Sequence, residues 1–197
     1  MRDSMLRRAS SALVDRLLAQ GLLDSEKRDW YIYTVQKRTI HLINTIISIS
    51  VFSMIWGFIP CASYLFAFLV VRKYAGGLHA STPIRCIVWS FVLTLCGMSF
   101  STFLLRTDIF LLCFLIAGLS VWLVHANSKG GLSSFSEVER CINRRKALLA
   151  SCLLAILAIV LILTSINEFM FMIGSYCCGG LFFASILTIP VKQKSIR

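Results

Sequence analysis

The chain alternates between long apolar runs and short polar segments. Five of the six apolar runs are long enough to cross a bilayer as a helix, which needs about 20 residues and tolerates about 17. The runs lie at Ile40–Ile59, Cys61–Val71, Ile87–Leu105, Ile109–Ala126, Ala147–Ile166 and Phe169–Pro190. This pattern predicts an all-α, polytopic membrane protein with about six transmembrane or partly re-entrant helices.

The second run, Cys61–Val71, is too short to span by itself. One interpretation is a helix that continues through Arg72 and Lys73, whose long side chains reach the membrane interface. The other is a shorter or re-entrant pair formed with a neighbouring run. We expect the first.

Residues 1–39 have a different pattern. Apolar residues fall on one side of a possible helix, with arginines and Asp15 interleaved, which predicts an amphipathic helix at the membrane interface. The apolar positions are Leu6, Ala9, Leu13, Leu17 and Leu18. Aromatic residues near Trp30 favour the headgroup level. We expect residues 1–39 to form a cytoplasmic or interfacial region, 40–190 the membrane domain and 191–197 a cytoplasmic tail.

The distribution of basic residues along the chain predicts its orientation in the membrane. The chain has 20 Lys and Arg against 9 Asp and Glu, a net charge of +11, while 57% of its residues are hydrophobic. The basic residues concentrate before Ile40, in Arg72–Cys86, in Lys129–Lys146 and after Pro190. With six crossings these segments share one side, so both termini and the Arg72–Cys86 segment are expected in the cytoplasm. Flanking basic residues indicate contact with membrane lipids and argue against nucleic acid as a partner.

The eight cysteines and three histidines do not indicate a metal site or a disulfide framework. No C-x-x-C pair occurs, and most of the cysteines lie inside apolar runs. The histidines, His41, His79 and His125, are far apart and are not grouped with other ligands. We therefore expect neither a metal ion nor another cofactor.

The segment Arg72–Cys86 contains a base and a nucleophile seven residues apart, His79 and Cys86. On an unbroken α-helix these residues share a face but lie roughly 10.5 Å apart along the axis. A direct hydrogen bond needs about 3 Å, so the helix must break between them. Pro83 suits the first position of a new helix, with Ser81 or Thr82 as its cap.

Cys86 would then lie in the first turn of that helix. The positive end of the helix dipole, Arg85 and a protonated His79 would favour its thiolate. Gly76 and Gly77 allow a tight turn or a close approach to substrate, and offer amide donors to an oxyanion. Arg72 could pair with an acidic group of a peptide or with a lipid phosphate.

Each of these features also has a simpler interpretation. A histidine in a membrane loop commonly serves at the interface, and a cysteine that opens a transmembrane helix commonly serves in packing. Basic residues beside a span set topology, and a double glycine forms turns. No third residue that would orient the histidine is evident from the sequence.

The run Arg72-Lys73-Tyr74-Ala75-Gly76-Gly77-Leu78-His79-Ala80, with Cys86 seven residues beyond the histidine, resembles the signature of the AgrB family of accessory gene regulator proteins. The charged amphipathic start, the aromatic approach to the first span, the six apolar runs and the polar loop after the fourth run also match. The resemblance covers nearly the whole chain, although only the segment Arg72–Cys86 is a specific motif.

This resemblance implies a membrane cysteine endopeptidase of a bacterial quorum-sensing system that acts on an AgrD-like peptide precursor. Cys86 would attack a peptide carbonyl, with His79 as general base and then general acid. A thioester to the enzyme would form as the C-terminal tail leaves, and an internal nucleophile of the substrate would close a thiolactone or lactone ring. The resemblance also implies a homodimer.

One departure concerns the loop after the fourth run. Family members often have a proline-containing segment with an aspartate there, whereas this chain reads His125-Ala126-Asn127-Ser128-Lys129. Two other functions also fit six spans and a polar loop: a peptide transporter and a noncatalytic membrane scaffold. A transporter predicts ionisable residues near mid-membrane, but Asp108 and Glu168 lie at the ends of runs.

Overall fold

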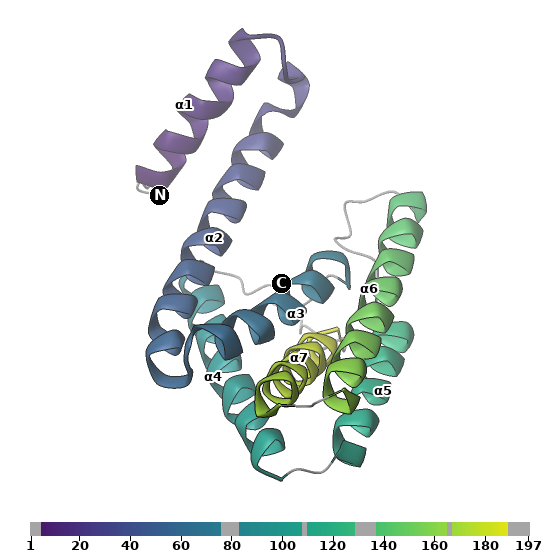
Figure 1. The fold of residues 1–197 in the computed structure, drawn as a ribbon. Helices are drawn as coiled ribbons and strands as arrows, with labels where there is room; N and C mark the ends of the chain where they lie inside the picture. The colour runs from purple at the N-terminus through teal and green to yellow at the C-terminus, as the bar shows by residue number, and fades with distance from the viewer. Residues whose placement is uncertain (1–4, 76–82, 108–109, 129–136, 165–166, 189–197) are drawn as a thin grey trace, which may run out of the picture. The chain divides into compact units, whose positions relative to one another are not determined.

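The structure is a computed structural model that describes residues 5–75, 83–107, 110–128, 137–164 and 167–188 (Figure 1). The side chains of residues 5–6, 37 and 83–86 lie outside this description. Within these ranges the chain is helical and contains no strand. The elements are α1 (Met5–Ala19), a 3₁₀ turn (Ser25–Lys27), α2 (Arg28–Trp56), α3 (Phe58–Ala75), α4 (Pro83–Thr107), α5 (Phe110–Asn127), α6 (Glu137–Leu163) and α7 (Glu168–Ile186).

Six of the described helices, α2 to α7, are long and apolar enough to cross a membrane. This confirms the all-α, polytopic fold that the apolar runs predict. The short second run is part of α3, which has 18 residues and includes Arg72 and Lys73. The helix therefore continues through both basic residues, as expected. Gly57, with a φ of 87°, separates α2 from α3 in a conformation that glycine adopts without strain.

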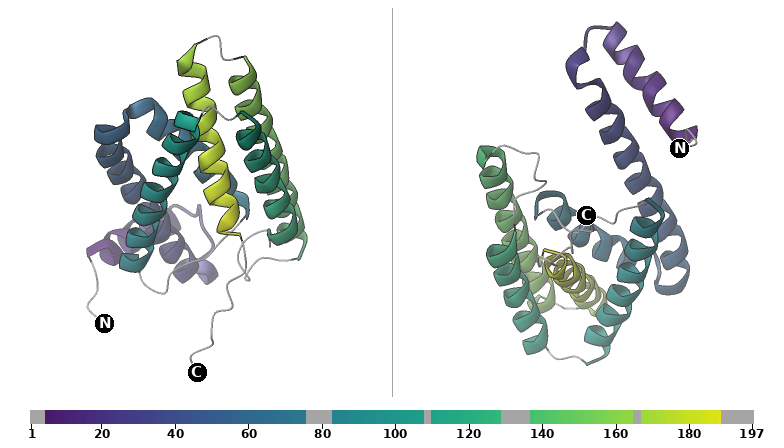
Figure 2. Two further views of the ribbon diagram at one scale, coloured as in Figure 1. Left: turned by 90° about the horizontal axis from the view of Figure 1, so that it is seen from below. Right: turned by 180° about the vertical axis from the view of Figure 1, so that it is seen from behind.

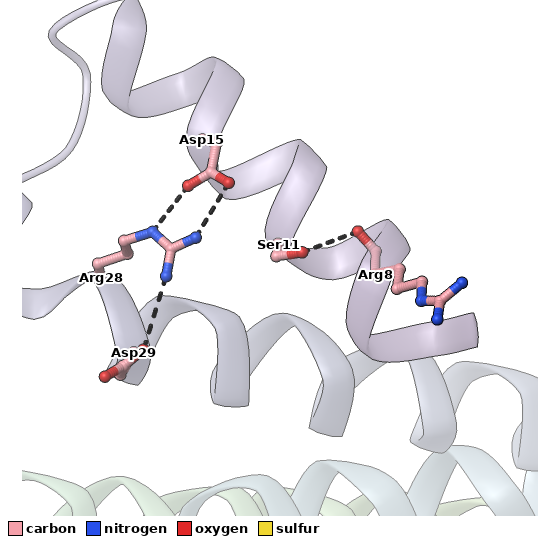
Figure 3. A network of polar contacts seen from close by, with 5 residues as sticks. All are labelled: Arg8, Ser11, Asp15, Arg28 and Asp29. Atoms are coloured by element: carbon pink, nitrogen blue, oxygen red, sulfur yellow. Dashed lines mark hydrogen bonds and ion pairs between the residues drawn. The ribbon is translucent and has the colours of Figure 1, made fainter. Parts of the chain in front are cut away.

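The described chain divides into two compact units, Met1–Ile47 and Ser48–Arg197. In the first, α1 lies alongside the N-terminal half of α2 (Figure 1). The Arg28 guanidinium donates two hydrogen bonds to the Asp15 carboxylate, at 2.7 Å and 3.0 Å (Figure 3). This bidentate, exposed ion pair joins the two helices and lowers the pKa of the Asp15 carboxyl, chiefly through the hydrogen bond from Arg28.

One side of α1 is buried within the hairpin. Val14 is fully buried and Ser10 nearly so, whereas Leu13 is 48% exposed. The helix faces the first part of α2, where Ile32 is also buried. The packed stripe of α1 therefore includes positions 10 and 14 and leaves position 13 outside.

The second unit is organised around α7. This helix packs against α3, α4, α5 and α6, and the two views of Figure 2 show it between the α3 and α4 side and the α5 and α6 side. Small residues bring these helices close together. A Cβ added at Gly180 would collide with the backbone carbonyl of Tyr64 in α3, and one at Gly97 of α4 would collide with the Tyr64 ring.

A polar cluster joins α2, α4 and α7 inside this unit. The Trp56 indole donates to the Thr102 hydroxyl at 2.9 Å, and the Tyr176 and Thr102 hydroxyls are 2.8 Å apart. Thr102 in turn donates to the Met98 carbonyl. With its one proton given to Met98, Thr102 accepts from both aromatic residues, so the cluster is internally satisfied.

Candidate functional site

The predicted dyad lies at the boundary between α3 and α4. Helix α4 begins at Pro83, the residue expected at its first position, so Cys86 lies in the first turn of that helix. Arg85 lies in the same turn, and the side chains of both residues lie outside the described set. His79, Gly76 and Gly77 also lie outside the described residues. The pairing of Cys86 with His79 therefore stays a prediction.

Arg72 lies in the last turn of α3. Its guanidinium carbon is 5.5 Å from the centroid of the Phe68 ring, one turn earlier, in a cation–π arrangement. The neighbouring Lys73 ammonium is 5.2 Å from the centroid of the Tyr74 ring. Both cations thus lie beside aromatic rings at the end of α3, which is where long basic side chains meet a membrane interface. The proposed contact of Arg72 with a peptide or a lipid phosphate stays a prediction.

One face of the described part of α4 packs against neighbouring helices. Positions 93, 97, 101 and 104 recur at intervals of three or four residues, which is one face of a helix. The Leu93 carbonyl accepts a hydrogen bond from the Tyr64 hydroxyl of α3 at 3.3 Å. A Cβ at Gly179 of α7 would meet the Ser101 hydroxyl, and Leu104 is buried. This face of α4 is therefore the one that packs on α3 and α7.

Hydrogen bonds join helix ends next to the motif. The Ser128 hydroxyl, just after α5, is 3.5 Å from the carbonyl of Ala75, the last residue of α3. Both residues are buried. The Arg144 guanidinium of α6 donates to the His125 carbonyl of α5 at 2.9 Å. These contacts join the end of α3 to α5, and α5 to the first part of α6. The end of α3 directly precedes Gly76 in the sequence.

Thr188, just beyond the end of α7, connects α7 to α5. Its hydroxyl is 2.6 Å from the Ser185 carbonyl and 3.5 Å from the Leu123 carbonyl of α5. The shorter distance identifies Ser185 as the main acceptor. The ends of α3, α5 and α7 and the first part of α6 thus meet at one end of the second unit.

Sequence reasoning missed Ser128, Arg144 and Thr188 as parts of this end. A single serine, arginine or threonine near a helix end gives no periodic signal. Their partners are backbone carbonyls at helix ends, which no side-chain pattern in the sequence reveals.

The arrangement can support nucleophilic chemistry at the start of α4. The first turn of a helix leaves backbone amides without helical partners and carries a partial positive charge. Both features stabilise a thiolate and an oxyanion. The double glycine and the histidine, which precede this turn by four to seven residues, supply the residue types that acyl transfer requires.

Comparison with known proteins agrees with the sequence motif. The family model for accessory gene regulator B matches residues 10–191 of the chain. No curated protein and no solved structure matches the chain significantly. The family match includes all the helices from α2 to α7, the segment Arg72–Cys86 and most of α1. The chain therefore belongs to the AgrB family, membrane proteins of the agr quorum-sensing system whose expected partner is an AgrD-like propeptide.

Proposed function

We propose that the protein is a membrane-embedded cysteine endopeptidase that removes the C-terminal tail of an AgrD-like precursor, with Cys86 as nucleophile and His79 as general base. The observation that supports this most directly is the start of α4 at Pro83. It gives Cys86 a helix N-terminus, an environment that favours the reactive thiolate. Membership of the AgrB family supports the peptide substrate.

The first step forms a thioester. His79 takes the proton of the Cys86 thiol, and the sulfur attacks the carbonyl carbon of the bond to be cut. Amides of the Gly76–Gly77 segment and of the first turn of α4 stabilise the negative charge on the carbonyl oxygen. The carbon–nitrogen bond then breaks, and protonated His79 gives its proton to the amine of the departing tail.

The second step releases the product. His79 takes the proton of a thiol or hydroxyl within the remaining peptide as that group attacks the thioester carbon, and the Cys86 sulfur leaves and regains the proton from His79. Exchange of one thioester for another is nearly neutral in energy, and ring closure within one molecule has a high effective concentration. A site bounded by apolar helices keeps water from hydrolysing the intermediate. The product is a cyclic thiolactone or lactone.

The membrane arrangement that goes with this function has both termini and the Arg72–Cys86 segment in the cytoplasm. A propeptide synthesised in the cytoplasm would then reach the dyad from the side on which it is made. The homodimer implied by the family resemblance and the contact with membrane lipids are parts of the same proposal. Cross-linking in native membranes tests the homodimer, and cysteine labelling from either side of the membrane tests the orientation.

Substitution of the dyad tests the proposal. Purified protein in lipid vesicles is mixed with a precursor from the same organism, and the released tail is measured by mass spectrometry. Cys86→Ala and His79→Ala should each abolish release while abundance and membrane insertion stay unchanged. The matched control is Cys96→Ala, because Cys96 lies on the same helix and is exposed. Tail release at the normal rate by Cys86→Ala would disprove the assignment.

A further inference from the structure

Ion pairs occupy the turn end of the hairpin formed by α1 and the first part of α2. Arg28 pairs with Asp15 and Asp29 (Figure 3). The Lys27 ammonium lies 3.8 Å from the Asp24 carboxylate. The described carboxylates of the hairpin all lie at this end, at positions 15, 24, 26 and 29. No described carboxylate is therefore left to neutralise cations at the opposite end.

The opposite end of the hairpin is cationic. It carries Arg7, Arg8 and Arg38, which are all exposed, and we call these three residues the basic end. The Arg8 guanidinium makes no hydrogen bond or ion pair with any described residue (Figure 3). In the sequence, residues 1–8 and 37–38 hold five cations and one carboxylate, so the charge of these stretches is positive when every residue is counted. This excess of cations suits an anionic partner.

The contact between Asp15 and Arg28 gives the level of the basic end along α2. The two helices run antiparallel (Figure 1), so residues counted back from Asp15 are level with residues counted forward from Arg28. Seven residues in each direction put Arg8 level with Val35. Both helices rise by the same distance per residue, so this register holds along the hairpin. The buried residues of the hairpin, at positions 10, 14 and 32, all fall inside the overlap that it defines.

The same count places the basic end at the membrane boundary. The apolar run of α2 begins at Ile40, five residues beyond Val35, which is roughly 7.5 Å along the helix, and Arg38 is closer still. The headgroup layer is roughly 5 to 8 Å thick on each side of a bilayer. The long Arg8 side chain inclines toward the N-terminus of α1, which is the direction of Ile40. Arg28, by contrast, lies roughly 18 Å from Ile40 along α2, outside the headgroup layer.

We propose that the hairpin meets the membrane with its basic end, where Arg8 and Arg38 bind the phosphates of anionic phospholipids. In this arrangement α1 runs away from the bilayer and only its first turns touch lipid, whereas an amphipathic helix lying along the interface would touch lipid over its whole length. Arginine donates paired hydrogen bonds to phosphate oxygens, and an anionic surface attracts basic segments beside it. The inference rests on the proposed membrane arrangement, in which α2 enters the bilayer near Ile40, and not on the peptidase chemistry.

Photo-crosslinking of the full chain in nanodiscs tests the contact. The nanodiscs contain phosphatidylcholine and phosphatidylglycerol, and benzoylphenylalanine replaces either Ala9 or Ala19, which are both exposed on α1. By the same register Ala9 lies roughly 9 Å from Ile40 along the hairpin axis, and Ala19 roughly 24 Å. After irradiation, mass spectrometry should find lipid on position 9 and none on position 19.

The identity of the labelled lipid tests the role of charge. Phosphatidylglycerol should be enriched among the lipid adducts of position 9, relative to its share of the bilayer. Arg8→Gln should lower this enrichment about fivefold, the factor that corresponds to one cation at an anionic surface. The matched control is Arg16→Gln, an exposed arginine about two turns further from the membrane on the same helix. It should leave the enrichment unchanged.

Three outcomes would overturn this inference. Equal labelling of positions 9 and 19 would show that α1 lies along the interface, and no labelling of position 9 would show that the basic end does not touch the bilayer. A lack of enrichment, or the same loss in Arg16→Gln as in Arg8→Gln, would show that this end does not select anionic lipid. Each outcome is read from lipid adducts and is independent of precursor cleavage. Failure here therefore leaves the peptidase proposal to be decided by Cys86→Ala.

Discussion

Helices α2 and α7 have similar apolar compositions but different surroundings. Both are long and apolar enough to cross a membrane, yet the most apolar part of α2 is 11% buried within the protein and that of α7 is 61% buried. Hydropathy therefore selects helices that belong in a bilayer without deciding which of them lies at the centre of the bundle. In a membrane, lipid tails are as apolar as leucine, so burial of apolar surface against another helix offers little gain by itself.

The difference lies in small residues. Helix α7 contains the run Gly174-Ser175-Tyr176-Cys177-Cys178-Gly179-Gly180, all of which is buried. The glycines of this run let neighbouring helices approach closely, which increases van der Waals contact and favours association in lipid. The exposed part of α2 has large side chains instead, including Val51, Met54 and Ile55. Close packing, rather than apolarity, places α7 at the centre.

The largest effect that we predict comes from truncating a large side chain on each helix. Leu181→Ala on α7 removes a fully buried side chain and should lower the free energy of unfolding by about 3 kcal/mol. Ile55→Ala on α2, where the side chain is 64% exposed, should change it by less than about 0.5 kcal/mol. Unfolding in detergent with increasing denaturant measures both. Equal losses would contradict the different surroundings of the two helices.

A somewhat smaller effect should follow from filling the close contact at Gly180. A methyl group there would meet the Tyr64 carbonyl, which is backbone and cannot move aside cheaply. Gly180→Ala should therefore destabilise the protein by about 2 kcal/mol. Gly118→Ala on α5 is the control, because its Cβ would meet nothing within 4 Å. It should be neutral or slightly stabilising. A neutral Gly180→Ala would show that α3 and α7 are not in close contact there.

Removal of one buried hydroxyl should have a still smaller effect. Tyr176→Phe keeps the ring in place but deletes the hydroxyl that bonds to Thr102. The expected loss is about 1 kcal/mol in the free energy of unfolding, typical of one neutral hydrogen bond. A double-mutant cycle with Thr102→Val isolates this pair. Additive effects of the two substitutions would show that the hydroxyls do not interact.

The smallest effect concerns the hairpin of α1 with the first part of α2. The pKa of the Asp15 carboxyl is lowered by Arg28, so the ion pair stabilises the hairpin above the ordinary carboxyl pKa. The contribution is lost as the pH falls through the lowered pKa, below about 4. The protection of α1 amides from hydrogen exchange, relative to an unfolded chain at the same pH, should therefore fall at acidic pH more in the unmodified protein than in Asp15→Asn. An equal response of the two proteins would exclude a role for this pair.

The apolar runs predicted the helices well, because a bilayer demands long helices that satisfy their own backbone groups. The extension of α3 through Arg72 and Lys73 was predicted because long basic side chains tolerate a helix end at the interface. The central position of α7 was not predicted, since runs with similar hydropathy gave no reason to single it out. The burial of Ser10 and Val14 in α1 was not predicted either, because it depends on packing against another helix rather than on the pattern along α1.

The candidate site was likewise predicted only in part from the sequence. Pro83 predicted the start of α4, and with it the position of Cys86 in a first turn, because proline suits that place in a helix. The contact of Ser128 with Ala75 was not predictable. It depends on which helix ends come together, and a single serine in this place resembles many others in the chain.

The measurement that tests the peptidase mechanism most directly is capture of the thioester. A precursor whose internal thiol or hydroxyl is replaced by alanine lacks the nucleophile for ring closure, so the acylated enzyme should accumulate. Mass spectrometry of the digested protein should then find the N-terminal part of the precursor on Cys86, removable by hydroxylamine. Release of the tail without any adduct on Cys86, or with the adduct on another cysteine, would contradict the proposed mechanism.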